Sequence, residues 1–215
     1  MSDTDATATS AHLRILNAAE WVRARSHPLM VRTADDSISA SVFEGWVTIN
    51  THFLRTYRRF LMVMGTLAPD PRGSRLMFQG VQDTDEELRR AEDFAAKRGV
   101  DLNAPPSARS MDYSSYCMAS VGQGWARGLV VAFGVEALYY DAWAYARAEA
   151  DESGRFWDFI DLWSSSFQAD FVAGLSVLVD KLEPTPELER IFRSTIRLEL
   201  ASWDEAYGLA PAIAE

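Results

Sequence analysis

Apolar residues recur along most of this chain at steps of three and four positions, the spacing that places side chains on one face of an α-helix. One such stripe begins near Ser39 and contains a single polar residue, Asn50. Its apolar members are Phe43, Trp46, Phe53, Tyr57 and Leu61. A polar amide on a buried face has to be hydrogen-bonded, so the sequence predicts that Asn50 binds either a neighbouring helix or a ligand.

The same spacing predicts further helices, and residues at their ends agree with it. Ser10 is a suitable N-cap for a first helix that ends before Pro28, and Pro186 suits the first position of a last helix. The other helices with an apolar stripe are predicted at residues 110–121, 128–147 and 156–183.

The segment from Asp83 to Gly99 is charged rather than apolar. Its composition predicts a short helix capped by Asp83 or Thr84 and ended by Gly99, with most of its surface facing solvent. A loop is predicted before it, at residues 69–73, where two prolines and a glycine fall close together.

No stretch of the sequence alternates in the manner of a β-strand. The chain is therefore predicted to be all-α, a single-domain bundle of about seven or eight helices with an aromatic core. Residues 1–9 are small and polar and are predicted to form a disordered tail, which leaves residues 10–215 as one helical domain.

The segment from Gly128 to Arg147 contains a carboxylate, Glu136, within an apolar and aromatic run. In a helix, Glu136 shares a face with Tyr139, Tyr140 and Trp143. A buried carboxylate is costly unless it is paired, protonated or used in chemistry. The alternative is that Glu136 lies at the rim of the core, and the pattern alone leaves both open.

Composition limits the classes of partner. The net charge of −10 argues against binding to nucleic acid, which requires a clustered basic surface. No segment has the length of uninterrupted apolar sequence expected of a membrane span, and the N-terminus does not resemble a signal peptide, so a cytoplasmic location is expected. The single cysteine, Cys117, is expected to be buried, and the absence of CxxC and HExxH patterns predicts no metal site and no cofactor.

Five spaced motifs resemble the TenA family, the thiaminase II-like proteins of the haem-oxygenase-like fold. The most specific is VEALYYDAW at residues 135–143, which is similar to the branch of the family that has Glu in place of the active-site Cys. The others are His27-Pro28, FEGWVTINTHF at residues 43–53, YSSYCMAS at residues 113–120, and the Glu199 to Trp203 pattern of the predicted last helix.

The resemblance implies roles for five residues. The catalytic acid/base of the family corresponds to Glu199, and the nucleophile position corresponds to Glu136. Tyr116, Tyr140 and Trp163 correspond to aromatic residues that contact the ligand.

Two further positions depart from the pattern of the family. An Asp that binds the aminopyrimidine is replaced by Asn50, and a Tyr three residues later is replaced by Phe53. Both positions are expected to contact the substrate, but Asn carries no charge and offers one acceptor and one donor group. The resemblance therefore indicates the location of a site more firmly than the identity of its ligand.

The resemblance implies a hydrolase that cleaves the C–N bond of a pyrimidine in thiamin salvage or degradation, or of a related small aromatic heterocycle. Glu199 is expected to donate a proton to the leaving amine, and Glu136 to act as the base or to anchor the ligand. The resemblance also implies a homo-oligomer, either a tetramer or a dimer.

Two alternatives remain open at this point. One is a small-molecule-binding homologue without catalytic activity. The other is a metal-dependent oxygenase on the same fold, with oxygen ligands from Glu44, Asp141 and the two glutamates and a single histidine, His52, on a suitable helix.

Overall fold

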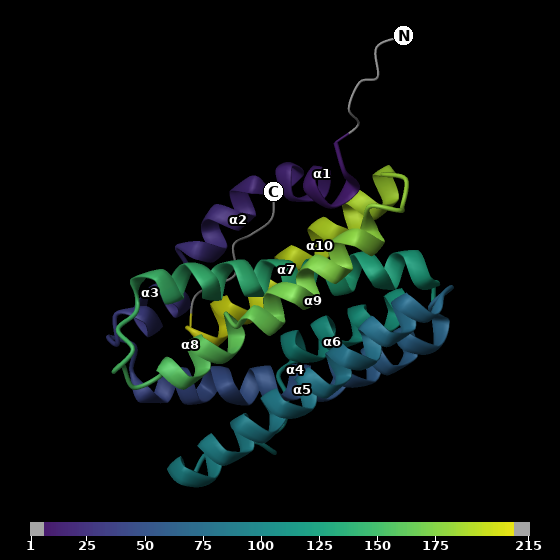
Figure 1. Cartoon of the computed structure of the whole chain (residues 1–215). Helices are drawn as coiled ribbons and strands as arrows, with labels where there is room; N and C mark the ends of the chain where they lie inside the picture. The colour runs from purple at the N-terminus through teal and green to yellow at the C-terminus, as the bar shows by residue number, and fades with distance from the viewer. Residues whose placement is uncertain (1–6, 209–215) are drawn as a thin grey trace.

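Helices are the only regular secondary structure in the part of the chain that the computed structural model describes, residues 7–208 (Figure 1). The predicted all-α class is therefore confirmed. Residues 1–6 of the predicted tail lie outside the described range. The helical segments are α1 (Thr9–Leu16), α2 (Ala18–Arg25), α3 (Pro28–Ala34), α4 (Ala40–Leu67), α5 (Pro71–Arg98), α6 (Ala108–Val121), α7 (Trp125–Glu149), α8 (Trp157–Trp163), α9 (Ser166–Val179) and α10 (Pro186–Ala206).

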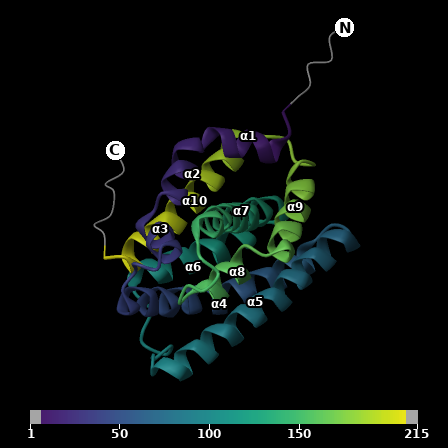
Figure 2. The ribbon, with the colours of Figure 1, turned by 60° about the vertical axis from the view of Figure 1, so that its left-hand side comes forward.

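Helix α7 runs through the centre of the bundle, and the view in Figure 2 shows it surrounded by other helices. Every residue from Gly128 to Tyr139 is buried. A helix that is apolar on all sides is stable only where all sides are covered, which explains why this segment has no polar face. Glu136 is thus a buried residue, with 9% of its surface exposed, and not a residue at the rim of the core.

Helices α4 and α5 form a long antiparallel hairpin along one side of α7 (Figure 1). The predicted start of α4 is confirmed, because the Ser39 hydroxyl accepts a hydrogen bond from the amide of Val42. The hairpin is closed by a short turn, where the carboxylate of Asp70 caps α5 by accepting a hydrogen bond from the amide of Gly73.

The prediction for residues 69–99 is wrong in one respect that matters for the site. Pro71 is the first residue of a continuous 28-residue helix, so no separate charged helix begins at Asp83. Thr84 lies inside α5, where its hydroxyl donates to the carbonyl of Gly80. Because α5 packs against α4, its middle is covered, and Glu87 is buried there.

Two predicted helices are each divided by a local break, and one helix was not predicted. The first divides at Asn17, whose side-chain amide donates to the carbonyl of Leu13. The aromatic helix divides after Trp163, and Ser165 caps the new helix α9. Helix α3 begins directly at Pro28, and the ring of His27 caps it by accepting from the amide of Leu29.

The α8–α9 stretch, Trp157–Val179, is long and apolar enough to cross a membrane by length and composition alone. In the structure, α9 packs against α7 and α5, and the side chains of Phe171 and Leu175 are buried in this contact. Buried residues make up 39% of its most apolar window, while other apolar side chains of the stretch, such as Phe167 and Val177, are exposed.

Two glycines allow a sharp test of this packing. A Cβ atom at Gly80 in α5 would lie 2.5 Å from the ring of Phe171, whereas a Cβ at Gly45 in α4 would meet nothing within 4 Å. Gly80→Ala is expected to lower the free energy of unfolding by about 1–3 kcal/mol through overpacking. The matched control, Gly45→Ala, should raise it by about 0.5–1 kcal/mol because alanine favours the helix. Chemical denaturation measures both, and an equal effect of the two substitutions would contradict the close approach of α5 and α9.

Candidate active site

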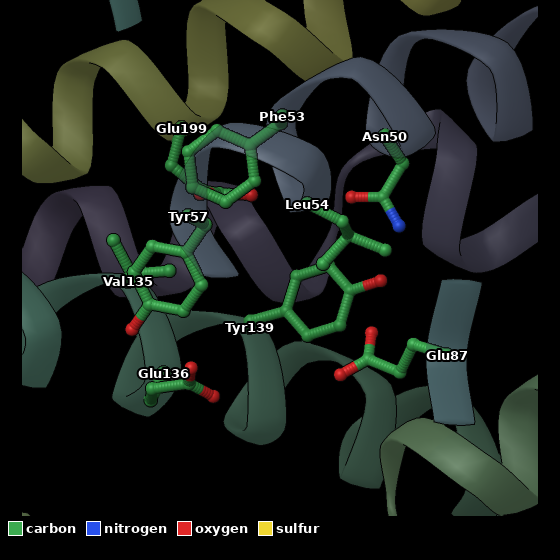
Figure 3. A pocket seen from close by; sticks show the side chains of 9 residues that line it. All are labelled: Asn50, Phe53, Leu54, Tyr57, Glu87, Val135, Glu136, Tyr139 and Glu199. Atoms are coloured by element: carbon green, nitrogen blue, oxygen red, sulfur yellow. The ribbon is translucent and has the colours of Figure 1, made fainter. Parts of the chain in front are cut away.

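A small, partly open cavity lies between α4, α5, α7 and α10 (Figure 3). The volume of this cavity is about 20 Å³, which is room for about one water molecule. Three carboxyl groups, one amide and three aromatic rings surround it. The residues that line it are Asn50, Phe53, Leu54, Tyr57, Glu87, Val135, Glu136, Tyr139 and Glu199.

Glu199 of α10 is held by a hydrogen bond at each of its carboxyl oxygens. The hydroxyl of Tyr113 donates to Oε2 over 2.5 Å, and the indole of Trp203 donates to Oε1 over 2.8 Å. Burial raises the pKa of Glu199 to about 7, although both hydrogen bonds act to lower it. These bonds favour the ionised form of Glu199 over its neutral form.

Glu136 of α7 has no hydrogen bond to any residue in the range 7–208. The hydroxyl of Tyr57 points toward its carboxyl group (Figure 3) without reaching hydrogen-bonding geometry. Burial is the main cause that raises the pKa of Glu136 to about 8, the charge of Glu87 adds to it, and the proximity of the Tyr57 hydroxyl acts to lower it. Glu136 is therefore mostly protonated at pH 7, when it can act as a proton donor.

Glu87 of α5 is a third buried carboxyl group, which the sequence did not indicate. Its Oε2 accepts from the indole of Trp163 over 2.9 Å, and its Oε1 accepts from the amide of Gln168 over 3.3 Å. Burial raises its pKa to about 7. Residues 83–99 were expected to face solvent because their composition is charged, and at Glu87 this expectation is wrong.

Aromatic rings form the walls of the cavity. Phe53 lies parallel to Tyr113 and to Tyr57, with ring centroids 4.4 Å and 5.2 Å apart. The hydroxyl groups of Tyr57 and Tyr139 are buried without a hydrogen-bond partner among the described residues. Residues of this kind suit a flat ligand that stacks on rings and satisfies polar groups at its edges, but the present volume has to widen before such a ligand can enter.

The structure brings four of the seven predicted site residues to this cavity: Glu136, Glu199, Asn50 and Phe53. Trp163 lies behind it and reaches it through its hydrogen bond to Glu87. The roles that the resemblance implies for these residues remain predictions.

Tyr116 and Tyr140 do not line the cavity. The hydroxyl of Tyr116 donates to the carbonyl of Ile191, and its ring borders a separate surface pocket between α6 and α10. Tyr113, three residues earlier, occupies the buried face of α6 and contacts Glu199. On α7 the cavity is lined by Tyr139, while the adjacent Tyr140 is directed elsewhere because successive residues of a helix differ by about 100°.

A helical-phase argument could have identified Tyr113. Ser110, Cys117 and Ser120 share its face of α6, since they lie three or four positions apart. Cys117, predicted to be buried, is fully buried, and this burial raises the pKa of its thiol.

The side chains named for a metal-dependent oxygenase are not brought together. The carboxylate of Glu44 accepts from Arg98, that of Asp141 accepts from Trp21 and Arg25, and the ring of His52 contacts the carbonyl of Ala104. Among residues 7–208, no three His, Cys, Asp or Glu side chains are grouped in a way that could hold a metal ion.

Comparisons with known proteins agree with this architecture. The sequence profile described as TENA/THI-4/PQQC family matches residues 16–209. No curated protein matches the chain. Solved structures with a similar fold include a TenA homologue from Pyrococcus furiosus, with a TM-score of 0.87 and 24% identity over 93% of this chain and 100% of that chain.

Two further solved structures are similar at lower sequence identity. A TenA homologue from P. horikoshii OT3 has a TM-score of 0.82 and 18% identity, covering 94% of this chain and 99% of its own. A putative TenA-like thiaminase from Sulfolobus solfataricus has a TM-score of 0.82 and 13% identity, covering 95% and 98%. At these identities the likeness concerns the fold, so the predicted TenA-like helical fold is confirmed, and the chemistry has to be argued from the cavity.

The raised pKa of Glu136 predicts how stability depends on pH. A carboxyl group whose pKa rises from 4.5 in the unfolded chain to about 8 in the folded protein stabilises the fold below pH 4.5, and this contribution is lost as the pH rises through 8. Glu136→Gln is therefore expected to gain stability relative to wild type between pH 5.5 and 8, by about 1–3 kcal/mol. Thermal unfolding at both pH values measures this gain.

The control for this experiment is Glu92→Gln, which removes an exposed carboxylate from α5. Its difference from wild type should be the same at pH 5.5 and pH 8. A difference for Glu136→Gln that is also independent of pH would show that Glu136 is ionised in the folded protein across this range.

Proposed function

We propose that this chain, which belongs to the TENA/THI-4/PQQC family, is a hydrolase that cleaves a C–N bond of a small aromatic N-heterocycle. The substrate class is that of a pyrimidine bearing an amine or formylamine leaving group. The observation that carries the proposal is a pair of buried carboxyl groups, Glu136 and Glu199, at one aromatic cavity with different hydrogen bonding.

The hydrogen bonds favour a division of roles opposite to the one that the sequence suggested. Glu199 receives two donors and has the lower pKa, about 7, so it is the more readily ionised of the two and the one available to accept a proton. Glu136 lacks a hydrogen bond and has the higher pKa, about 8, so it holds its proton longer. We therefore assign Glu199 as the general base and Glu136 as the general acid.

The reaction that follows from this assignment is a balanced hydrolysis. Ionised Glu199 takes a proton from a water molecule, whose oxygen forms a bond to the carbon of the scissile C–N bond. Neutral Glu136 gives its proton to the departing nitrogen as the bond breaks. When the bond to the carbon attached to the pyrimidine breaks, the products are an alcohol and a neutral amine or formamide; when the formyl C–N bond breaks, they are formic acid and a neutral amine. Proton exchange with solvent then restores both carboxyl groups.

Tyr113 and Trp203 act as positioning residues in this scheme. They hold both oxygens of Glu199 in place, and neither lines the cavity. A fixed carboxylate loses less freedom when it orients the attacking water, which is a recognised contribution to the rate. Phe53, Tyr57 and Tyr139 provide surfaces on which a planar heterocycle can stack.

The similarity to the Sulfolobus solfataricus protein, named a putative TenA-like thiaminase, supports the choice of substrate class. The motif VEALYYDAW supports assignment to the branch with Glu in place of Cys, because Glu136 faces the cavity. A binding protein without catalysis would have no need of a hydrogen-bonded base beside a protonated acid, since charged or protonated carboxyl groups are costly to bury.

Substitution of either carboxyl group tests the chemistry. Hydrolysis of thiamin and of aminomethyl and formylaminomethyl pyrimidines should be measurable for the wild type on at least one substrate. Glu199→Gln and Glu136→Gln are each expected to reduce kcat by at least about 100-fold, the usual contribution of a general acid or base.

Glu92→Gln is the matched control and should keep the activity of the wild type, because residue 92 is exposed. If all three variants and the wild type are equally inert on every substrate while the wild type still binds them, the protein is a binding homologue and the hydrolase proposal fails.

The pH dependence of kcat/KM tests the division of roles. Activity requires Glu199 without its proton and Glu136 with its proton, so the profile should be bell-shaped, rising through about pH 7 and falling through about pH 8. Glu136→Gln should remove the falling limb from any residual activity. If Glu136→Gln instead loses the rise of kcat/KM with pH, Glu136 is the general base and the assignment made here is wrong.

A further inference from the structure

The cavity contains an uncompensated set of acidic groups. Three of the nine residues that line it are glutamates, and none is Lys, Arg or His. Ionised Glu87 raises the pKa of Glu136, which shows that these carboxyl groups disfavour one another. A bound cation would relieve this repulsion, because opposite charges attract strongly in a medium of low dielectric constant.

The charge of Glu87 is not needed for its hydrogen bonds. Its two oxygens accept from Trp163 and Gln168, which is half of the four acceptor positions of a carboxylate. A neutral glutamine at this position could accept from Trp163 and donate to Oε1 of Gln168, which is buried without a partner among the described residues. The local structure is thus satisfied at least as well by an amide, and the carboxylate calls for another explanation.

Glu87 and Asn50 lie at one end of the cavity in Figure 3, and Glu136 lies at the other end. The hydroxyl of Tyr139 points between Asn50 and Glu87 and is buried without a partner among residues 7–208. This end therefore offers a carboxylate, an amide and a phenol hydroxyl to the edge of a ligand, at a distance from the carboxyl pair assigned to the chemistry.

The outer side of Glu87 faces a surface pocket of about 330 Å³ between α5, α8 and α9. Asp83, Glu86 and Asp161 also line this pocket, so its surface is acidic. Its one basic residue, Arg90, donates to the carboxylate of Glu86. Glu87 and Gln168 stand where the pocket and the cavity approach each other, and a cation is attracted toward this point from solvent.

We propose that Glu87 determines the specificity of the site by binding the positively charged, N–H-bearing edge of a flat ligand, which Asn50 and Tyr139 contact from the other side. The ligand class is an amidine-like cation, in which two nitrogens on one carbon share a positive charge. A carboxylate binds such an edge with two parallel hydrogen bonds, and the tyrosine rings add cation–π attraction. The inference rests on the proposed function only for the location of the site.

Benzamidine and benzamide test this inference without any hydrolysis. They have nearly the same shape, but benzamidine is a cation at neutral pH and benzamide is not. Calorimetry at pH 7.5 should show that the wild type binds benzamidine about 10- to 100-fold more tightly than benzamide. Glu87→Gln should reduce this preference to within about threefold while leaving the affinity for benzamide unchanged.

Glu92→Gln, which removes an exposed carboxylate from the same helix, is the comparison variant and should keep the preference for the cation. A thermal midpoint of Glu87→Gln at or above that of the wild type shows that the variant is folded, since a buried charge has been removed. The inference is overturned if Glu87→Gln keeps the preference, if Glu136→Gln alone abolishes it, or if the wild type binds neither probe at millimolar concentration.

Binding and turnover separate this inference from the proposed hydrolysis. A wild type that prefers benzamidine but hydrolyses no pyrimidine supports the role of Glu87 and refutes the hydrolase. A wild type that hydrolyses a pyrimidine but does not prefer benzamidine to benzamide supports the hydrolase and refutes the role of Glu87.

Discussion

The close packing around the middle of α7, Gly128–Tyr139, is the constraint on which the rest of this molecule depends. Neighbouring helices cover this segment and leave only 9% of the surface of Glu136 exposed, so the surroundings of its carboxyl group are of low polarity. The low polarity around Glu136 then sets its protonation state, because ionisation without a partner is unfavourable. The same packing that stabilises the bundle thus keeps the carboxyl group of Glu136 protonated at its centre.

The three carboxyl groups at the cavity are buried to a similar extent but differ in the hydrogen bonds that they accept. Glu87, Glu136 and Glu199 are all nine-tenths buried or more, and burial is the main cause of the raised pKa of each. Donors from Trp163, Trp203 and other side chains reach two of them and not the third. Their differences in chemistry therefore come from neighbouring side chains, on the same helix for Trp203 and on other helices for Tyr113 and Trp163.

The sequence predicted the fold class and part of the site, and the remainder depended on tertiary contacts. Asn50 was placed correctly because α4 is long and its apolar stripe fixes the helical phase over many turns. Glu87 was missed because the buried face of α5 has few large apolar residues, Met77 and Val81, among small ones such as Gly80 and Ala91, so no continuous apolar stripe reveals it. Contacts from distant parts of the chain, such as the ring of Phe171 at Gly80 and the indole of Trp163 at Glu87, show that this face is covered.

The small size of the cavity has a consequence for the kinetics of ligand capture. A space for about one water cannot admit a heterocycle, so entry requires side chains such as Tyr139 to move before the ligand is enclosed. The apparent affinity is then the intrinsic affinity reduced by the fraction of molecules that are open at any moment. Association is gated by this opening, and residues that never touch the ligand set the rate through the packing they contribute.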